Sequence, residues 1–285
     1  MRELRGQFKL GMLLDLAGIS KQIYLYNVEH MDDKDHKDKE LEEEISKIYK
    51  QNYEKYGIPR MTIELNNRGY HINHKKVERL MKKLNIKARP KQRKYRSYKG
   101  EVGKIADNVL NRDFTTRFFY EKIGTDVTVF IGNFGKVYLS PIIDFHNREI
   151  LAYDISINPD FRQITRMFSE LKDKHGQKLK DTIIQSDQGW QYQMSKYRDK
   201  LKELKMIQSM SRRGNCLDNS PTENFFGRMK EEMFYGKENL YQTIEQLERA
   251  IREYIDYYNS VRIVRKFKMS PLQYKSLYEN NVMSI

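Results

Sequence analysis

The sequence predicts an α/β protein in which a small all-α region precedes a mixed core of strands and helices. Two observations predict it. Apolar residues recur at helical spacing through the first third of the chain, and from residue 123 the spacing changes to the alternation of strands. At 285 residues, the chain is long enough for one sizeable core and one or two small satellites.

Residues 1–40 predict a helical segment followed by a charged connector. Met12, Leu16 and Ile19 lie near helical spacing, with a break at Gly18. Residues 31–40 carry almost only charged side chains and offer nothing to bury, so we expect an unpacked connector there.

Residues 41–90 predict a helix–turn–helix DNA-binding domain. Leu41, Ile45 and Ile48 begin an apolar face that continues to Tyr56, where Gly57 and Pro59 should end the helix. A second helix is expected over residues 60–67, and a third begins after Asn73 as N-cap. The exposed face of the third helix is basic, which is typical of a recognition helix; its candidate DNA contacts are His74, Lys75, Lys76 and Arg79.

Residues 91–115 predict a basic linker. Basic residues, among them Arg93, Lys94 and Arg96, are interleaved with Tyr95, Tyr98 and Gly100; such a segment cannot pack, so it is expected to follow DNA phosphates. The alternative is a solvated tail that only aids solubility.

Residues 116–262 predict the core, and residues 263–285 a C-terminal tail. Strands are expected over 123–131, 135–143, 148–156, 182–185 and 206–209, with helices over 160–174, 192–204, 221–234 and 243–258. Two short turns make the first three strands an antiparallel meander. This order of elements describes a ribonuclease-H-like core, a mixed five-stranded sheet flanked by helices.

The charge of the chain indicates an anionic partner. The net charge is +14, from 53 Lys and Arg against 39 Asp and Glu, which favours nucleic acid or an anionic membrane. No apolar stretch approaches the ~20 residues that span a bilayer, so we expect no membrane partner. A single cysteine, Cys216, excludes a disulfide framework and indicates a reducing, cytoplasmic location.

Three acids are the candidate catalytic residues. Asp126 lies within the first expected strand although Asp is depleted in strands, Asp187 ends a buried strand, and Glu223 opens a helix. Each has a structural alternative: a charge on an edge strand for Asp126, a turn former for Asp187, and a capping box with Ser220 as N-cap for Glu223. Together on a basic chain they predict a divalent-metal site that cuts and joins a polyanion.

Other side chains are candidate substrate contacts. Lys230 lies seven residues after Glu223 on the same helical face and could reach a phosphate, although a plain surface lysine is the alternative. Trp190 and Tyr192 could stack on an unpaired base, or could instead wedge the next helix onto the core. Asp144, Asp154 and Asp218 are assigned to turns or caps.

The motifs around the three acids resemble a known family. Gly-Thr-Asp-Val-Thr at Asp126, Gln-Ser-Asp-Gln-Gly-Trp at Asp187 and Asp-Asn-Ser-Pro-Thr-Glu-Asn-Phe-Phe at Glu223 are similar to bacterial transposases of the insertion-sequence-three family. Nearly the whole chain is covered. Three features depart from the family: Ile123-Gly124 stands where a Trp is usual, Gln185 where a His is common, and no heptad run is present.

The resemblance implies a DDE transposase with a core like retroviral integrase. Asp126, Asp187 and Glu223 would hold two Mg²⁺ or Mn²⁺ ions, the DNA would be cut at an element end, and the freed 3′-hydroxyl would attack another phosphodiester. The residues that would position the strand are Lys230, Arg212, Arg213 and Asn215. Expected partners are terminal inverted repeats, target DNA, further copies of the chain and an upstream-frame helix–turn–helix protein. Two alternatives remain: a metal-dependent nuclease of the same fold, and a non-catalytic DNA-binding regulator.

Overall fold

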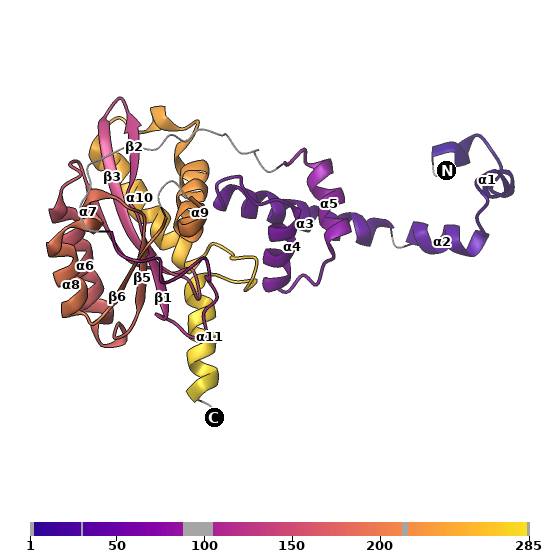
Figure 1. Ribbon diagram of the computed structural model, residues 1–285. Helices are drawn as coiled ribbons and strands as arrows, with labels where there is room; N and C mark the ends of the chain where they lie inside the picture. Colours follow the sequence, from indigo (N-terminus) through magenta and orange to yellow (C-terminus); the bar gives the residue numbers. More distant parts are fainter. Residues whose placement is uncertain (1–2, 30, 88–104, 213–215, 284–285) are drawn as a thin grey trace. The chain divides into compact units, whose positions relative to one another are not determined.

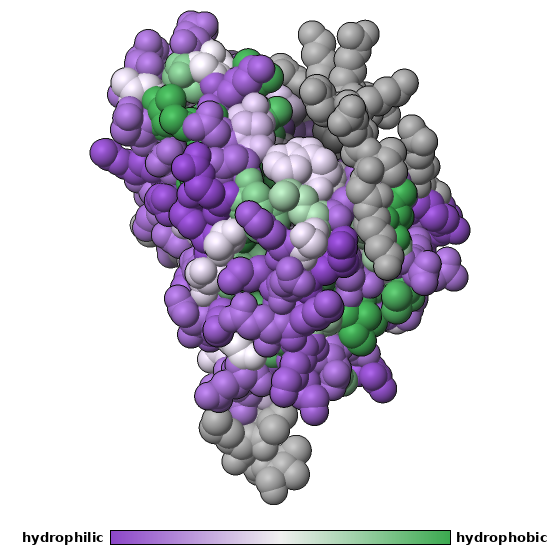
Figure 2. Space-filling model, turned by 60° about the vertical axis from the view of Figure 1, so that its left-hand side comes forward, coloured by the Kyte–Doolittle hydropathy of each residue, from purple (hydrophilic) through white to green (hydrophobic). Residues whose placement is uncertain are grey.

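The computed structural model describes residues 3–29, 31–87, 105–212 and 216–283. These residues form two compact units, Met1–Arg89 and Pro90–Ile285, which are described separately. The face of the molecule in Figure 2 is predominantly hydrophilic. Among the described helices, none has the length and apolar character needed to cross a membrane.

The first unit is all α, as predicted. After a short 3₁₀ turn, Glu3–Gly6, its helices are α1 (Leu10–Ala17), α2 (Lys21–Glu29), α3 (Met31–Gln51), α4 (Ile58–Asn67) and α5 (His74–Lys83) (Figure 1). Asn73 is the N-cap of α5, since its side chain accepts a hydrogen bond from the backbone N–H of Lys76. Fully buried Ile45, Met61 and Leu80 join α3, α4 and α5 in one small core.

Two expectations for this unit were wrong. The charged run 31–40 is not an unpacked connector but the first half of α3, and Asp38 within it forms ion pairs with Lys76 and Arg79 of α5. The helix also ends at Gln51 and not near Tyr56. Tyr53 and Glu54 adopt positive φ values of 55° and 58°, and this turn returns Tyr56 to the core, where it is 2% exposed.

The second unit contains a mixed sheet, as predicted. Its strands are β1 (Lys122–Thr125), β2 (Thr128–Gly132), β3 (Gly135–Asp144), β4 (Ile150–Ser156), β5 (Ile183–Ser186) and β6 (Ile207–Met210). β3 pairs antiparallel with β1, β2 and β4, whereas β1, β5 and β6 are parallel neighbours.

The first expected strand is interrupted at Asp126. β1 pairs with β3 through Thr125 and Ile142, and β2 resumes with Thr128 opposite Leu139. The unchanged register places Asp126 opposite Pro141, which has no backbone N–H for the ladder. Asp126 therefore lies in a gap between two strand segments and not within a regular strand.

Helices cover both faces of the sheet (Figure 1). One face carries α6 (Phe161–His175), α7 (Trp190–Gln193) and α8 (Ser195–Glu203), and the other carries α9 (Ser220–Met229) and α10 (Ile244–Ser260). The core on the first side includes Ile123, Ile184 and Phe168. The expected C-terminal tail contains a further helix, α11 (Pro271–Met283).

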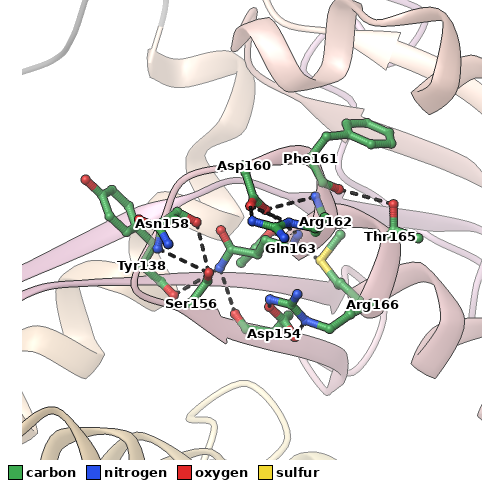
Figure 3. A network of polar contacts seen from close by, with 12 residues as sticks. Tyr138, Asp154, Ser156, Asn158, Asp160, Phe161, Arg162, Gln163, Thr165 and Arg166 are labelled. Atoms are coloured by element: carbon green, nitrogen blue, oxygen red, sulfur yellow. Dashed lines mark hydrogen bonds and ion pairs between the residues drawn. The ribbon is translucent and has the colours of Figure 1, made fainter.

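Polar contacts fix the start of α6 against the edge of the sheet (Figure 3). The Asp160 side chain caps the helix by accepting from the N–H groups of Arg162 and Gln163. The Gln163 side-chain amide donates to the carbonyls of Tyr138 on β3 and Asp154 on β4, at 3.0 Å each. Asp154, expected in a turn or cap, lies within β4, where its carboxylate pairs with Arg166 at 2.8 Å.

Candidate active site

The fold brings the three predicted acids to one edge of the sheet. Asp126 directly follows β1 and Asp187 directly follows β5, and these two strands are parallel neighbours. The carboxyl ends of parallel neighbours meet at the same edge, so these two acids are close in space. Glu223 lies in the first turn of α9, whose start packs against β1.

Gly124 permits the close approach of α9 to β1. A Cβ atom at this position would lie 2.6 Å from Oγ1 of Thr222 and 2.5 Å from Cζ of Phe145. Both side chains would have to shift to admit a Cβ atom here, so glycine allows this close approach of the helix. The result is that Glu223 is positioned beside the strand that ends at Asp126.

Burial raises the pKa values of all three acids, and neighbouring carboxylates raise those of Asp126 and Glu223 further. Burial raises the pKa of Asp126 well above its ordinary value, and the charges of Asp187 and Glu223 raise it further. Burial raises the pKa of Asp187, and burial together with the charge of Asp187 raises that of Glu223. All three side chains nevertheless remain partly accessible to solvent, as groups that meet a substrate must be.

The three carboxylates have few stabilising partners. Asp126 accepts a hydrogen bond from the backbone N–H of Val127 at 2.7 Å and a longer one from Nδ2 of Asn219 at 3.4 Å. Asp187 accepts from the backbone N–H of Gly189 at 2.8 Å. In the described part of the chain, none of the three acids forms an ion pair within 4 Å with a lysine, arginine or histidine.

Elsewhere in the same unit, buried acids are paired with cations. Asp218 is fully buried and contacts both Arg112 and Arg212, and buried Glu232 pairs with Arg262. Fully buried Asp144 is an exception, since it accepts hydrogen bonds from the backbone N–H groups of Tyr120 and His146, and the three candidate acids are also without an ion pair among the described residues. Over the described residues, no three His, Cys, Asp or Glu side chains form a ready-made ligand set, so an ion would require side-chain rotation. The donors are carboxylate oxygens only, which suits Mg²⁺ or Mn²⁺ and not Zn²⁺.

The capping-box alternative for Glu223 was wrong. The helix begins at Ser220, so Asn219 is the N-cap, and the Asn219 side chain makes no capping hydrogen bond. Ser220 is the first residue of the helix and lies one position after the N-cap. Glu223 is therefore not engaged with the backbone at the start of α9, and its carboxylate is available for another role.

Lys230 is not on the regular face of a helix but begins a π-helical turn, Lys230–Phe234. Its Nζ atom donates to the carbonyl of Val129 on β2 at 2.7 Å and lies 5.2 Å from the centre of the Phe130 ring. Burial lowers its pKa to about 8, opposed by the negative charge of Asp126. The plain surface lysine is thus excluded, since this ammonium group is half-buried beside the acid cluster.

The two aromatic candidates near Asp187 have different environments. Tyr192 is fully buried and contacts the ring of Tyr197 with centroids 5.3 Å apart. The expectation that Tyr192 stacks on a base was wrong, because its ring belongs to the core. Trp190 is 41% exposed at the start of α7 and remains accessible to a partner.

The loop before α9 is anchored by Asp218. This residue was expected in a turn or cap, but its buried carboxylate contacts Arg112 at 2.7 Å and Arg212 at 2.9 Å. Arg212 is therefore partly engaged within the protein, while half of its side chain stays exposed. Arg213 and Asn215 lie outside the described residues.

The other basic residues predicted to contact DNA also differ in their environments. Lys76 and Arg79 pair with Asp38, at 3.1 Å and 2.5 Å. His74 and Lys75 are exposed at the start of α5. Arg93, Lys94 and Arg96 lie outside the described residues.

Sequence reasoning missed Asn219 and Gly124. Asn219 donates to Asp126, and Gly124 admits α9. Gly124 had a usable signal, because a glycine inside a strand pattern often marks a close approach. Asn219 had none, since its contact depends on the fold.

Comparison with known families agrees with this architecture. Residues 35–94 match an HTH-like domain, and residues 120–216 and 223–277 match the integrase core domain. InsK of insertion sequence element IS150 from Escherichia coli (strain K12), named as a transposase, is 43% identical over 97% of this chain and 96% of its own length. A transposase-like protein of Haemophilus influenzae is 54% identical over 72% of this chain and 94% of its own length.

Among solved structures, the catalytic core domain of HTLV-2 integrase in complex with magnesium is similar to this chain. The match covers 54% of this chain and 95% of that one, at 13% identity and a TM-score of 0.44.

Proposed function

The chain belongs to the insertion-sequence transposases with an integrase core, and on that premise we propose that Asp126, Asp187 and Glu223 are its catalytic, metal-binding residues. The observation that carries the proposal is the unpaired cluster of three acids. Burial and neighbouring negative charge disfavour the ionised forms of Asp126 and Glu223, yet among the described residues no lysine, arginine or histidine forms an ion pair with any of the three acids. A bound cation would supply the missing counter-charge.

Two divalent ions fit the proposed chemistry. Asp126 and Asp187 would be the shared or principal ligands, and Glu223 would complete the second site. Bound ions would lower the pKa of an attacking water and stabilise charge on the attacking and leaving oxygens. Cleavage at an element end would release a 3′-hydroxyl, which would then attack a target phosphodiester directly.

The residues around the acids would hold the DNA strand. Lys230 would contact a phosphate beside Asp126, and Trp190 would stack on an unpaired base. Arg212 would contact the DNA backbone while it keeps its ion pair with Asp218. Arg213 and Asn215, which follow Arg212 in the chain, would also position the strand. These roles follow from position and charge, and each is part of the proposal.

The first unit would bind DNA through α5. His74 and Lys75 are exposed and would contact DNA directly. Lys76 and Arg79 would contact a DNA phosphate after their ion pairs with Asp38 break. We keep the functional division of the chain as first expected: residues 41–90 for end binding, 91–115 for phosphate contacts through Arg93, Lys94 and Arg96, and 116–262 for catalysis. Several copies would act together on two element ends, and an upstream-frame helix–turn–helix protein is a candidate partner.

The decisive experiment is a joining assay with Asp187→Asn. The purified chain is incubated with Mg²⁺, pre-cleaved end DNA taken from the sequence flanking the gene, and a target plasmid. Wild type should join the end to the plasmid, and the variant should lose joining by at least about a thousandfold, as expected when a metal ligand is removed. DNA binding, measured by fluorescence anisotropy, should change less than about twofold.

The matched control is Asp199→Asn, the same chemical change at an exposed position of α8. It should join DNA at the wild-type rate. Cleavage without joining by wild type would instead indicate a nuclease. DNA binding without either reaction, equal in wild type and Asp187→Asn, would indicate a regulator.

A further inference from the structure

The turn that carries Lys230 has an unusual backbone. α9 ends at Met229, and residues Lys230–Phe234 continue as a π-helix, with the Tyr235 N–H bonded to the Lys230 carbonyl at 2.6 Å. A π-helical turn is rare and frequently lies at a functional site. Some feature of the fold must therefore stabilise this turn.

Glu232 lies in the middle of the turn and is bound by a buried network. Its carboxylate accepts hydrogen bonds from Nε and Nη2 of Arg262, at 2.8 Å and 2.5 Å, in a fork-to-fork arrangement. The hydroxyl of Tyr254 donates to the same carboxylate at 2.8 Å. Arg262 follows the end of α10, and its side chain is only 1% exposed.

Stability alone is a weak reason for this network. A buried ion pair costs desolvation energy, and an apolar pair of similar volume often stabilises a fold as well or better. What an ion pair adds is geometry, because a bidentate guanidinium–carboxylate contact is directional. Here the contact between Glu232 and Arg262 fixes the backbone two residues after Lys230.

The other end of the turn is fixed against β2. Lys230 donates to the Val129 carbonyl, and Phe234 packs edge-on against Phe130 with ring centroids 5.1 Å apart. Val129 and Phe130 follow closely after Asp126 in the chain. The turn is thus held by α10 on one side and by the strand that carries the first acid on the other.

We propose that Glu232, Arg262 and Tyr254 are positioning residues, which hold the π-helical turn so that the Lys230 ammonium group is presented beside Asp126. None of the three contacts the substrate in this scheme. The inference rests on the proposed function of the acid cluster and assigns to the end of α10 a role in the reaction.

A double-mutant cycle tests the proposal. Single-turnover joining rates at saturating end DNA are measured for wild type, Lys230→Met, Glu232→Gln and the double variant. If Glu232 acts through Lys230, each single change should slow joining by about tenfold, and the double variant should be within about twofold of Lys230→Met. A merely structural role predicts multiplied effects, about a hundredfold in the double variant, and that result would overturn the proposal.

Matched variants keep the test sharp. Glu231→Gln, the neighbouring acid in the same turn, should join at the wild-type rate. If Glu232→Gln fails to fold, Tyr254→Phe replaces it in the cycle, since it removes a single hydrogen bond, with an expected loss of about fivefold. If the effects of Tyr254→Phe and Lys230→Met on the joining rate multiply, or if Tyr254→Phe causes no loss, the positioning role would again be refuted.

Failure of this inference is distinguishable from failure of the proposed function. If the acids are not catalytic, Asp187→Asn joins DNA like wild type. If only the positioning role is wrong, Asp187→Asn abolishes joining while the Lys230 and Glu232 effects multiply.

Discussion

Replacing Asp126 with Asn should remove the stabilisation of the protein by Mg²⁺. In the metal-free protein, Asp126 is half-buried, and this burial and the charges of two neighbouring carboxylates raise its pKa, so its ionised form is disfavoured. A divalent ion that binds the folded state alone stabilises it by RT ln(1 + [L]/Kd), which is about 1.4 kcal/mol at free Mg²⁺ tenfold above Kd. For a unit the size of Pro90–Ile285, this corresponds to a rise in Tm of about 3–6 °C.

The assay is thermal unfolding followed by circular dichroism, in EDTA and over a Mg²⁺ series. Wild type and the Asp199→Asn control should show the full rise, whereas Asp126→Asn should shift by less than about 1 °C. In EDTA at pH 7.5, Asp126→Asn should be at least as stable as wild type, because it removes a repelled charge. An equal Mg²⁺ shift in wild type and Asp126→Asn would refute the assignment of the metal site.

The pH dependence has a definite sign. Because folding raises the pKa values of Asp126, Asp187 and Glu223, the folded metal-free state binds protons more readily than the unfolded chain. Their contribution to stability is full below the unfolded pKa values, near 4, and is lost as pH rises through the raised ones. Mg²⁺ competes with these protons, so the Mg²⁺-induced rise in Tm should grow over the same pH range.

Three further predictions concern other parts of the chain. Gly124→Ala should lower the free energy of unfolding by about 1–3 kcal/mol and slow joining, because its Cβ would displace α9; unchanged urea unfolding would contradict this. Tyr192→Ala should cost about 3–5 kcal/mol, whereas Trp190→Ala should cost about 0.5 kcal/mol or less and weaken binding to unpaired end DNA; the opposite pattern would reverse their assignments. Asp38→Asn should release Lys76 and Arg79 and steepen the salt dependence of DNA binding by up to about 2 in log–log slope; an unchanged slope would show that neither side chain reaches phosphate.

Much of the fold could be predicted from local patterns. The change from helical to alternating spacing located both units, and the order of strands and helices predicted the mixed sheet. The position of Asp187 directly after a buried strand was also predicted, whereas Asp126 was expected within a strand and lies between two. Helix ends with strong signals, such as the Asn73 cap, were predicted to the residue.

Contacts between distant segments decided the rest. Pro141 lies opposite Asp126, where the strand is interrupted. Arg262 binds Glu232 in the turn that follows α9, and Asp38 forms an ion pair with Arg79 of α5. None of these pairings has a local signal. Periodicity reports which face of an element is apolar, but the partner of a polar group depends on which segment folds against it.

By itself, the sequence determined the fold class and the family and singled out the three acids as candidates, because strand and helix patterns and short motifs are local properties of the chain. Only the tertiary structure decided that these acids form no ion pair with the described residues, that the Tyr192 ring is buried in the core and that Lys230 begins a π-helical turn. The physical reason is that burial, charge pairing and backbone strain are properties of the assembled environment.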